Sequence, residues 1–160
     1  MDKMPINVVV FGSIPEAALI ISLGLILIGI RPSFKKIVLV AIIQGIASYY
    51  IRRNVEFGMH TVLQYISMCI LAWLIIKVPF RLSLLGILIG IIISSLIEGT
   101  MILILPKIMG LSLAEIMSRS WIRVGLFLPQ LSILSILNYL CCRYNFTLES
   151  EIGLVKKISR

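Results

Sequence analysis

The chain has 160 residues, 59% of them hydrophobic, and its mean hydropathy is +1.08. Its long apolar runs exclude an ordinary soluble domain, because about 20 apolar residues in a helix cross a bilayer core about 30 Å thick. The net charge of +8 does not indicate nucleic-acid binding, since the basic residues stand at the ends of the apolar runs. There they set topology and contact anionic lipid headgroups. We expect an all-α integral membrane protein of the cell membrane, without cofactor, metal or nucleic acid.

The first apolar region contains a helix-start pattern. Ser13 and Glu16 are spaced as a capping box, and Pro15 falls inside the first turn of the helix that would follow. We therefore place the first membrane-spanning helix at residues 13–30 and read residues 5–12 as a separate apolar lead-in. A single kinked helix that begins in the lead-in is the alternative.

Four further spans follow along the chain. They are expected at residues 37–51, 59–76, 82–105 and 123–142. Segment 112–122 is amphipathic and is expected to lie along the membrane interface. The sequence thus predicts a bundle of about five transmembrane helices and one interfacial helix within residues 1–142, followed by a basic tail, residues 143–160.

The distribution of lysine and arginine predicts the orientation of the bundle. With five spans, the loops 31–36 and 77–81 share one side with the tail, and together they hold nine of the 15 basic residues. The positive-inside rule places this side in the cytoplasm. We expect the N-terminus outside and the C-terminus in the cytoplasm.

A ladder of small residues in the fourth span leads to an acidic residue. Gly86, Gly90, Ser94 and Glu98 are four residues apart, so they form one face on which another helix can approach closely. A carboxyl group at this depth costs about 2.5–3.5 kcal/mol on insertion scales, which favours a function for it. Glu98 could bind a proton, a cation or a ligand, or it could lock two helices together by hydrogen bonding.

Other polar residues are secondary candidates. Glu16 could cap its helix or pair with an arginine such as Arg52 at the outer face. His60 could be a pH switch or an interfacial hydrogen-bonding residue. Three amides could line a pocket with Glu98 or merely join helices by hydrogen bonds. These amides are Gln44, Gln64 and Asn138.

Three short motifs carry a resemblance to a known family. They are SIPEA at 13–17, LGLILIG at 23–29 and FGMHT at 57–61. The chain resembles, over roughly residues 8–105, the multi-span membrane sensor region of Gram-positive sporulation-phosphorelay-type sensor histidine kinases. The resemblance implies signal reception in the membrane with output through a cytoplasmic helix. It supplies no catalytic residue, and only the 18-residue tail follows the last span here.

A second resemblance concerns His60 and Cys69. The stretch from Arg52 to Cys69 is similar to the accessory gene regulator B-type membrane peptidases, which carry a catalytic histidine followed by a cysteine. In that family a Gly-Gly pair precedes the histidine, and the cysteine lies two turns on along the same face. Here nine residues separate the two, which puts them on opposite sides of a helix. A dyad needs hydrogen-bond reach, so we do not expect an enzyme.

These observations favour a non-enzymatic sensory or interaction module. It would assemble with itself or with a membrane partner subunit through the face of Gly86, Gly90 and Ser94. One alternative is the small-molecule-binding subunit of a membrane transporter, with Glu98 in its pocket. The others are a structural subunit of a membrane assembly and the His/Cys peptidase.

Overall fold

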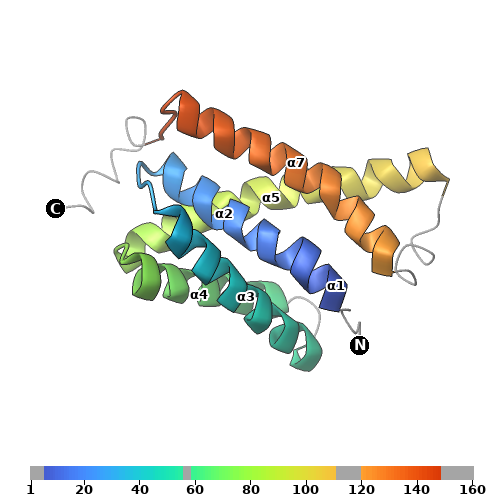
Figure 1. The fold of residues 1–160 in the computed structure, drawn as a ribbon, viewed down its shortest axis with the longest axis horizontal. Coiled ribbons are helices and arrows are strands. Elements are labelled where there is room, and N and C mark those ends of the chain that lie inside the picture. The colour runs from blue at the N-terminus through green and yellow to red at the C-terminus, as the bar shows by residue number, and fades with distance from the viewer. Residues whose placement is uncertain (1–5, 56–58, 111–119, 149–160) are drawn as a thin grey trace.

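The computed structural model describes residues 6–55, 59–110 and 120–148, and within these ranges every regular element is helical. The elements are α1 (Ile6–Val8), the π-helix η1 (Val9–Ser13), α2 (Ile14–Leu27), α3 (Phe34–Asn54), α4 (Met59–Leu71), the π-helix η2 (Ala72–Ile76), α5 (Phe80–Met109) and α7 (Ser120–Arg143) (Figure 1). Among the described residues, four stretches are long and apolar enough to cross a membrane. They are Ile6–Leu27, Phe34–Asn54, Met59–Ile76 and Phe80–Ile108. The all-helical class is confirmed, and the apolar helices are compatible with a membrane protein.

The first helix starts before the expected capping box. Elements α1, η1 and α2 are continuous, and Ser13 has helical dihedrals (φ −65°, ψ −37°) without a capping hydrogen bond from its side chain. The prediction of a helix start at Ser13 was therefore wrong, and the single helix is the alternative that holds. Pro15 lacks an N–H group and crowds the preceding turn of an α-helix. The π turn accommodates it, since Ile14 donates to the carbonyl of Val9, five residues back.

Helices α3, α5 and α7 extend past their expected ends, whereas α4 and η2 together keep the expected bounds of 59–76. Helix α3 runs into the basic residues on both flanks of 37–51, whose long side chains can reach the headgroups from a helix. Helix α5 continues through Pro106 and ends at Gly110, which has φ 62° and a backbone N–H bonded to the Pro106 carbonyl. The fifth long helix, α7, covers the expected span 123–142 and begins three residues before it.

Two expectations fall mainly outside the described ranges. The expected interfacial helix was 112–122. Its residues 112–119 fall in the segment 111–119, which lies outside the described ranges, and its residues 120–122 form the start of α7. The tail is described only as far as Leu148.

Helix α2 is the centre of the bundle. It contacts α3 on one side and α5 and α7 on the other, and Figure 1 shows it between them. Eight of its fourteen residues are buried, including Ile21 and Leu25, which have no exposed surface. A helix that is apolar all round is typical of such a position.

Glycines allow α2 and α5 to approach to backbone contact. A Cβ atom added to Gly24 would lie 2.1 Å from the carbonyl oxygen of Gly86, and one added to Gly90 would lie 2.5 Å from that of Ile20. The face expected to receive a second copy or a partner is thus occupied by α2 of the same chain. This corrects the expectation of assembly through Gly86, Gly90 and Ser94.

Three connections meet at one end of the bundle. Leu148 donates its backbone N–H to the carbonyl of Leu27 at 2.7 Å, and the Arg31 guanidinium donates to the side-chain oxygen of Asn145. Lys36 reaches the carbonyl of Ile76 at 3.5 Å. The α2–α3 loop, the η2–α5 loop and the start of the tail therefore lie together (Figure 1).

We predict that Gly24→Ala destabilises the bundle. The new methyl group would meet backbone atoms that cannot move aside, and overpacking of this kind costs about 1–3 kcal/mol. A titration with sodium dodecyl sulfate of the protein in mild detergent micelles gives the unfolding midpoint. The matched control is Gly125→Ala, because no atom lies within 4 Å of a Cβ there. Equal midpoints for the two variants would contradict the close contact.

Candidate functional site

Three helices contribute to a polar junction inside the bundle. The Gln130 amide of α7 donates to Oε1 of Glu16 at 2.8 Å, and the Ser94 hydroxyl of α5 donates to the same oxygen at 3.4 Å. The Gln130 amide also lies 3.3 Å from the Ser94 oxygen. Gln130 is 2% exposed and Ser94 3% exposed, so these donors are withdrawn from solvent. The junction thus joins α2, α5 and α7 through a single carboxyl group.

Two other charged residues act on the Glu16 carboxyl through their electric fields. They are Glu98 on α5 and Arg52 in the last turn of α3. The Nε atom of Arg52 is buried and finds no hydrogen-bond partner in the described part of the chain. Arg52 was one of the arginines expected near Glu16, but the hydrogen-bonding partners in the structure are Gln130 and Ser94. Glu16 does not cap a helix start as expected, because the continuous helix that contains it begins at Ile6.

Glu98 differs from Glu16 in having no hydrogen-bond partner among the described residues. It is partly buried on α5, and Gly99 beside it has no atom within 4 Å of an added Cβ. It lies about 5 Å beyond the midpoint of the 30-residue helix, at 1.5 Å per residue. Ser94, one turn before it, faces the interior, so Glu98 stands where the packed face of α5 gives way to an open one.

The three amides expected to line one pocket fall into two separate clusters. Gln44 is fully buried between α3 and α4, where its amide donates to the Gln64 carbonyl at 3.4 Å and its oxygen accepts from Ser67 at 2.9 Å. Asn138 lies between α7 and α2, where its amide donates to the Leu19 carbonyl at 3.1 Å. The expected common pocket with Glu98 is therefore not formed. Gln44 and Asn138 thus make interhelical hydrogen bonds, the simpler of the two expectations. Gln64 takes part only through its backbone carbonyl, and its side-chain Nε2 is buried without a partner among the described residues.

His60 and Cys69 are separated along their helix. Nine residues correspond to about 13 Å of helix at 1.5 Å per residue. Cys69 has no exposed surface, and its thiol lies 3.9 Å from the backbone oxygen of Ser83. His60 is partly buried at the start of the helix. The thiol of Cys69 thus packs into the interface between α4 and α5.

Sequence reasoning missed the pairing of Gln130 with Glu16. The two residues are 114 positions apart, and no local pattern links them. The available signal was the presence of a lone glutamine next to Pro129 in an apolar helix, because such a side chain needs a partner in lipid.

Comparisons of the chain with protein-family models, curated proteins and solved structures give no match. Within the described residues, no three His, Cys, Asp or Glu side chains are grouped so that they could hold a metal ion.

We predict that Glu16 and Gln130 are energetically coupled. Glu16→Leu and Gln130→Leu are each expected to lower stability. The first leaves the buried Gln130 amide, and the second the partly buried Glu16 carboxyl, without its main hydrogen-bond partner. Interhelical hydrogen bonds in membranes average about 0.6 kcal/mol and reach about 1.7 kcal/mol, which sets the expected coupling. A double-mutant cycle on the free energy of unfolding in detergent measures it.

Ser132→Ala serves as the control for this cycle. Among the described residues its hydroxyl bonds the Leu128 carbonyl of its own helix and no other group. The residue is exposed, so the change should stay within about 0.5 kcal/mol. A coupling of zero between the two leucine variants would refute the junction.

Proposed function

We propose that this chain is a non-enzymatic, membrane-embedded interaction module whose binding face lies on the second half of α5. This face, which we call the Glu98 face, consists of Ser95, Glu98, Gly99 and Ile102. Ser95, Glu98 and Ile102 follow one another at spacings of three and four residues, so they share one side of the helix. The observation that carries the proposal is the partly buried Glu98, which has no hydrogen-bond partner among the described residues and lies near the middle of a long apolar helix.

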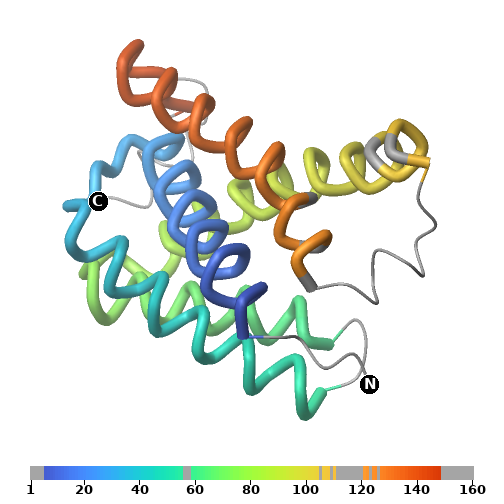
Figure 2. The backbone as a smooth tube through the Cα atoms, turned by 45° about the vertical axis from the view of Figure 1, so that its right-hand side comes forward, coloured from blue at the N-terminus to red at the C-terminus, as the bar shows by residue number. Residues whose placement is uncertain are grey.

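The surroundings of Glu98 support a contact with another helix. Ser95 and Gly99 are exposed, and Ile102 is 49% exposed. Figure 2 shows the C-terminal half of α5 extending beyond the other helices. In a bilayer this face would hold an acidic group against lipid, and an intramembrane acidic group normally faces protein or water. A partner helix would remove this cost and can approach closely over Gly99.

Charge favours a different partner subunit over a second copy. A twofold dimer uses the same patch on both subunits, so it would bring two Glu98 side chains together. Like charges at close range disfavour ionisation of both groups. We therefore commit to a transmembrane helix of a partner subunit that presents a hydrogen-bond donor or a basic group at the depth of Glu98.

The proposal includes the membrane arrangement expected from the sequence. Helix α7 has 24 residues, about 36 Å at 1.5 Å per residue, which suffices for a fifth span. The basic loops and the tail would face the cytoplasm, with the N-terminus outside. A sensory role, as in the kinase membrane regions that the chain resembles, would use the tail for output. Asn145 near the start of the tail accepts a hydrogen bond from Arg31 in the α2–α3 loop.

A transporter subunit is the second candidate, and one observation favours it. Glu98 and Arg52 both lie within electrostatic range of the Glu16 carboxyl at the three-helix junction. Clusters of ionisable residues inside a membrane mark proton and ion pathways in many transporters. In that case Glu98→Gln would abolish uptake or ligand binding while leaving subunit association intact.

We predict that a photo-crosslinking residue at Ile102 captures a partner subunit in the native membrane. The same residue at Ile46, which is 54% exposed on α3, should not. Glu98→Ala should reduce the crosslinked fraction between about threefold and about twentyfold, the range expected for one interhelical hydrogen bond. Gel mobility and mass spectrometry identify the adduct.

Thr100→Val is the control for the loss at Glu98. Thr100 is exposed on the same helix, and its hydroxyl bonds the Leu96 carbonyl of α5 itself at 2.7 Å. A crosslinked product at twice the mass of the chain would show that the partner is a second copy of this chain and not a different subunit. Equal crosslinking at Ile46 and Ile102 would contradict a specific face.

A further inference from the structure

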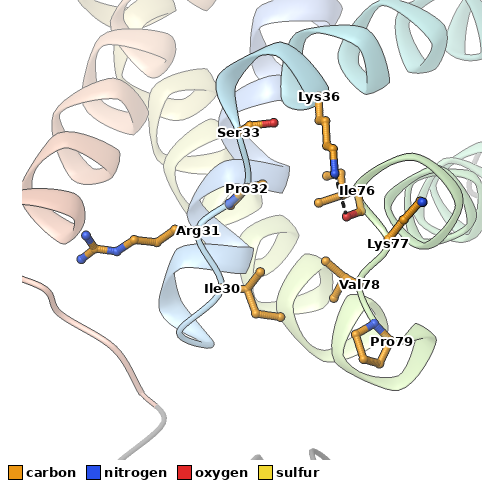
Figure 3. A pocket seen from close by; sticks show the side chains of 9 residues that line it. All are labelled: Ile30, Arg31, Pro32, Ser33, Lys36, Ile76, Lys77, Val78 and Pro79. Carbon is orange, nitrogen blue, oxygen red and sulfur yellow. Dashed lines mark hydrogen bonds between the residues drawn. The ribbon is translucent and has the colours of Figure 1, made fainter.

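A pocket of about 270 Å³ lies between two connections at the basic end of the bundle. One is the α2–α3 loop with the start of α3, and the other is the η2–α5 loop. Figure 3 shows Ser33 and Lys36 on the first and Lys77 on the second. The volume is just below the range of about 300–1,000 Å³ typical of sites for drug-sized ligands, so it suits a small group.

The charge of this pocket is positive, and no carboxylate of the described residues neutralises it. Within the described residues the only carboxylates are Glu16 and Glu98, which lie inside α2 and α5. Arg31 also lines the pocket, but its guanidinium is bonded to Asn145, and in Figure 3 it extends away from Lys36. Lys36 and Lys77 therefore remain as the two cations of the site.

Lys36 retains hydrogen-bonding capacity toward a ligand. Its ammonium contacts the Ile76 carbonyl at 3.5 Å, which is long for a hydrogen bond. An ammonium has three donors, so at least two are unused by this contact. Ser33 precedes α3, whose first turn has no acidic residue, and its hydroxyl makes no capping hydrogen bond to the helix.

The backbone at Lys77 gives an independent reason to expect a ligand. Lys77 has φ 65° and ψ 35°, the left-handed conformation. The other described residues of this kind at the ends of long helices are Gly29 with φ 83°, Gly110 with φ 62° and Asn145 with φ 51°, and glycine and asparagine are the residue types that adopt this conformation most readily. The left-handed conformation is unfavourable for a residue with a long side chain, because its Cβ comes too close to the following carbonyl oxygen. Strain of this kind clusters at functional sites.

We propose that this pocket binds a phosphate group, with the ammonium groups of Lys36 and Lys77 as its ligands. The group could be carried by an anionic phospholipid or be free in solution. The first turn of α3 adds the positive end of its helix dipole. This inference does not depend on the Glu98 face, because the pocket lies before the start of α5 and the Glu98 face lies on the second half of α5.

An apolar groove beside the same loop favours the phospholipid. Ile70, Trp73 and Phe80 line a space of about 400 Å³. The Trp73 and Phe80 rings pack edge to face with centroids 6.2 Å apart. Aromatic residues are typical of the membrane interface, where an acyl chain begins. A phospholipid could thus place its headgroup at Lys77 and its chain along this groove.

The test uses the full chain in dodecyl maltoside micelles, titrated with short-chain phosphatidylglycerol. Native mass spectrometry gives the fraction of protein that carries one lipid. Lys36→Gln and Lys77→Gln should each raise the Kd about fivefold, the effect of one lysine near an anionic headgroup. Lys77→Gly should weaken binding likewise without lowering the unfolding midpoint, because glycine relieves the backbone conformation.

Lys35→Gln is the matched control. It removes the same charge from the same turn of α3, but Lys35 does not line the pocket. A change in Kd below twofold is expected there. An equal loss in Lys35→Gln and Lys36→Gln would reduce the effect to general surface charge and overturn the site, as would unchanged binding in Lys36→Gln and Lys77→Gln.

Inorganic phosphate distinguishes the two sources. It is added at constant ionic strength against chloride, first alone and then in competition with the lipid. Binding of phosphate alone, weakened by Lys36→Gln and Lys77→Gln, assigns the site to the free anion as well. Lipid binding that is sensitive to these substitutions but not displaced by phosphate assigns it to the phospholipid. If the substitutions change the binding of neither phosphate nor lipid, the proposal is overturned.

Discussion

The backbone contact between α2 and α5 is the constraint on which the bundle depends. At Gly24 and Gly86 the two helices are so close that a single methyl group would collide with a carbonyl oxygen. In a lipid environment there is no hydrophobic driving force between helices, so close packing of this kind supplies much of the association energy. It makes α2 a fixed axis, and α3 and α7 pack around it.

The polar junction follows from this packing. Because α2 and α5 are in register at their glycines, Ser94 arrives beside Glu16, and Gln130 of α7 completes the set of donors. Glu98 lies one turn further along α5, where α2 no longer covers it. Glu16 is thus hydrogen-bonded within its own chain, whereas Glu98 has no hydrogen-bond partner among the described residues, and this difference is the basis of the proposed interaction role.

Sequence reasoning reached the helical class and the small-residue face, because composition and four-residue spacing are local properties. It could not identify the helix that covers Gly86 and Gly90, since spacing along one helix says nothing about its neighbour. The helix start at Ser13 failed for a physical reason: in lipid every backbone N–H needs a partner, so the helix continues through Pro15 by a π turn. The hydrogen bond between Gln130 and Glu16 was not predicted because the two residues are 114 positions apart in the sequence.

The length of α5 has a consequence for the membrane itself. Its 30 residues extend about 45 Å, whereas a hydrocarbon core is about 30 Å thick. An over-long helix tilts or locally thickens the bilayer around it. Since the glycine contacts fix α5 to α2, α5 cannot tilt alone, and a change in bilayer thickness would tip the bundle as one body. Lipid chain length would then alter the depth of Glu98 in the bilayer.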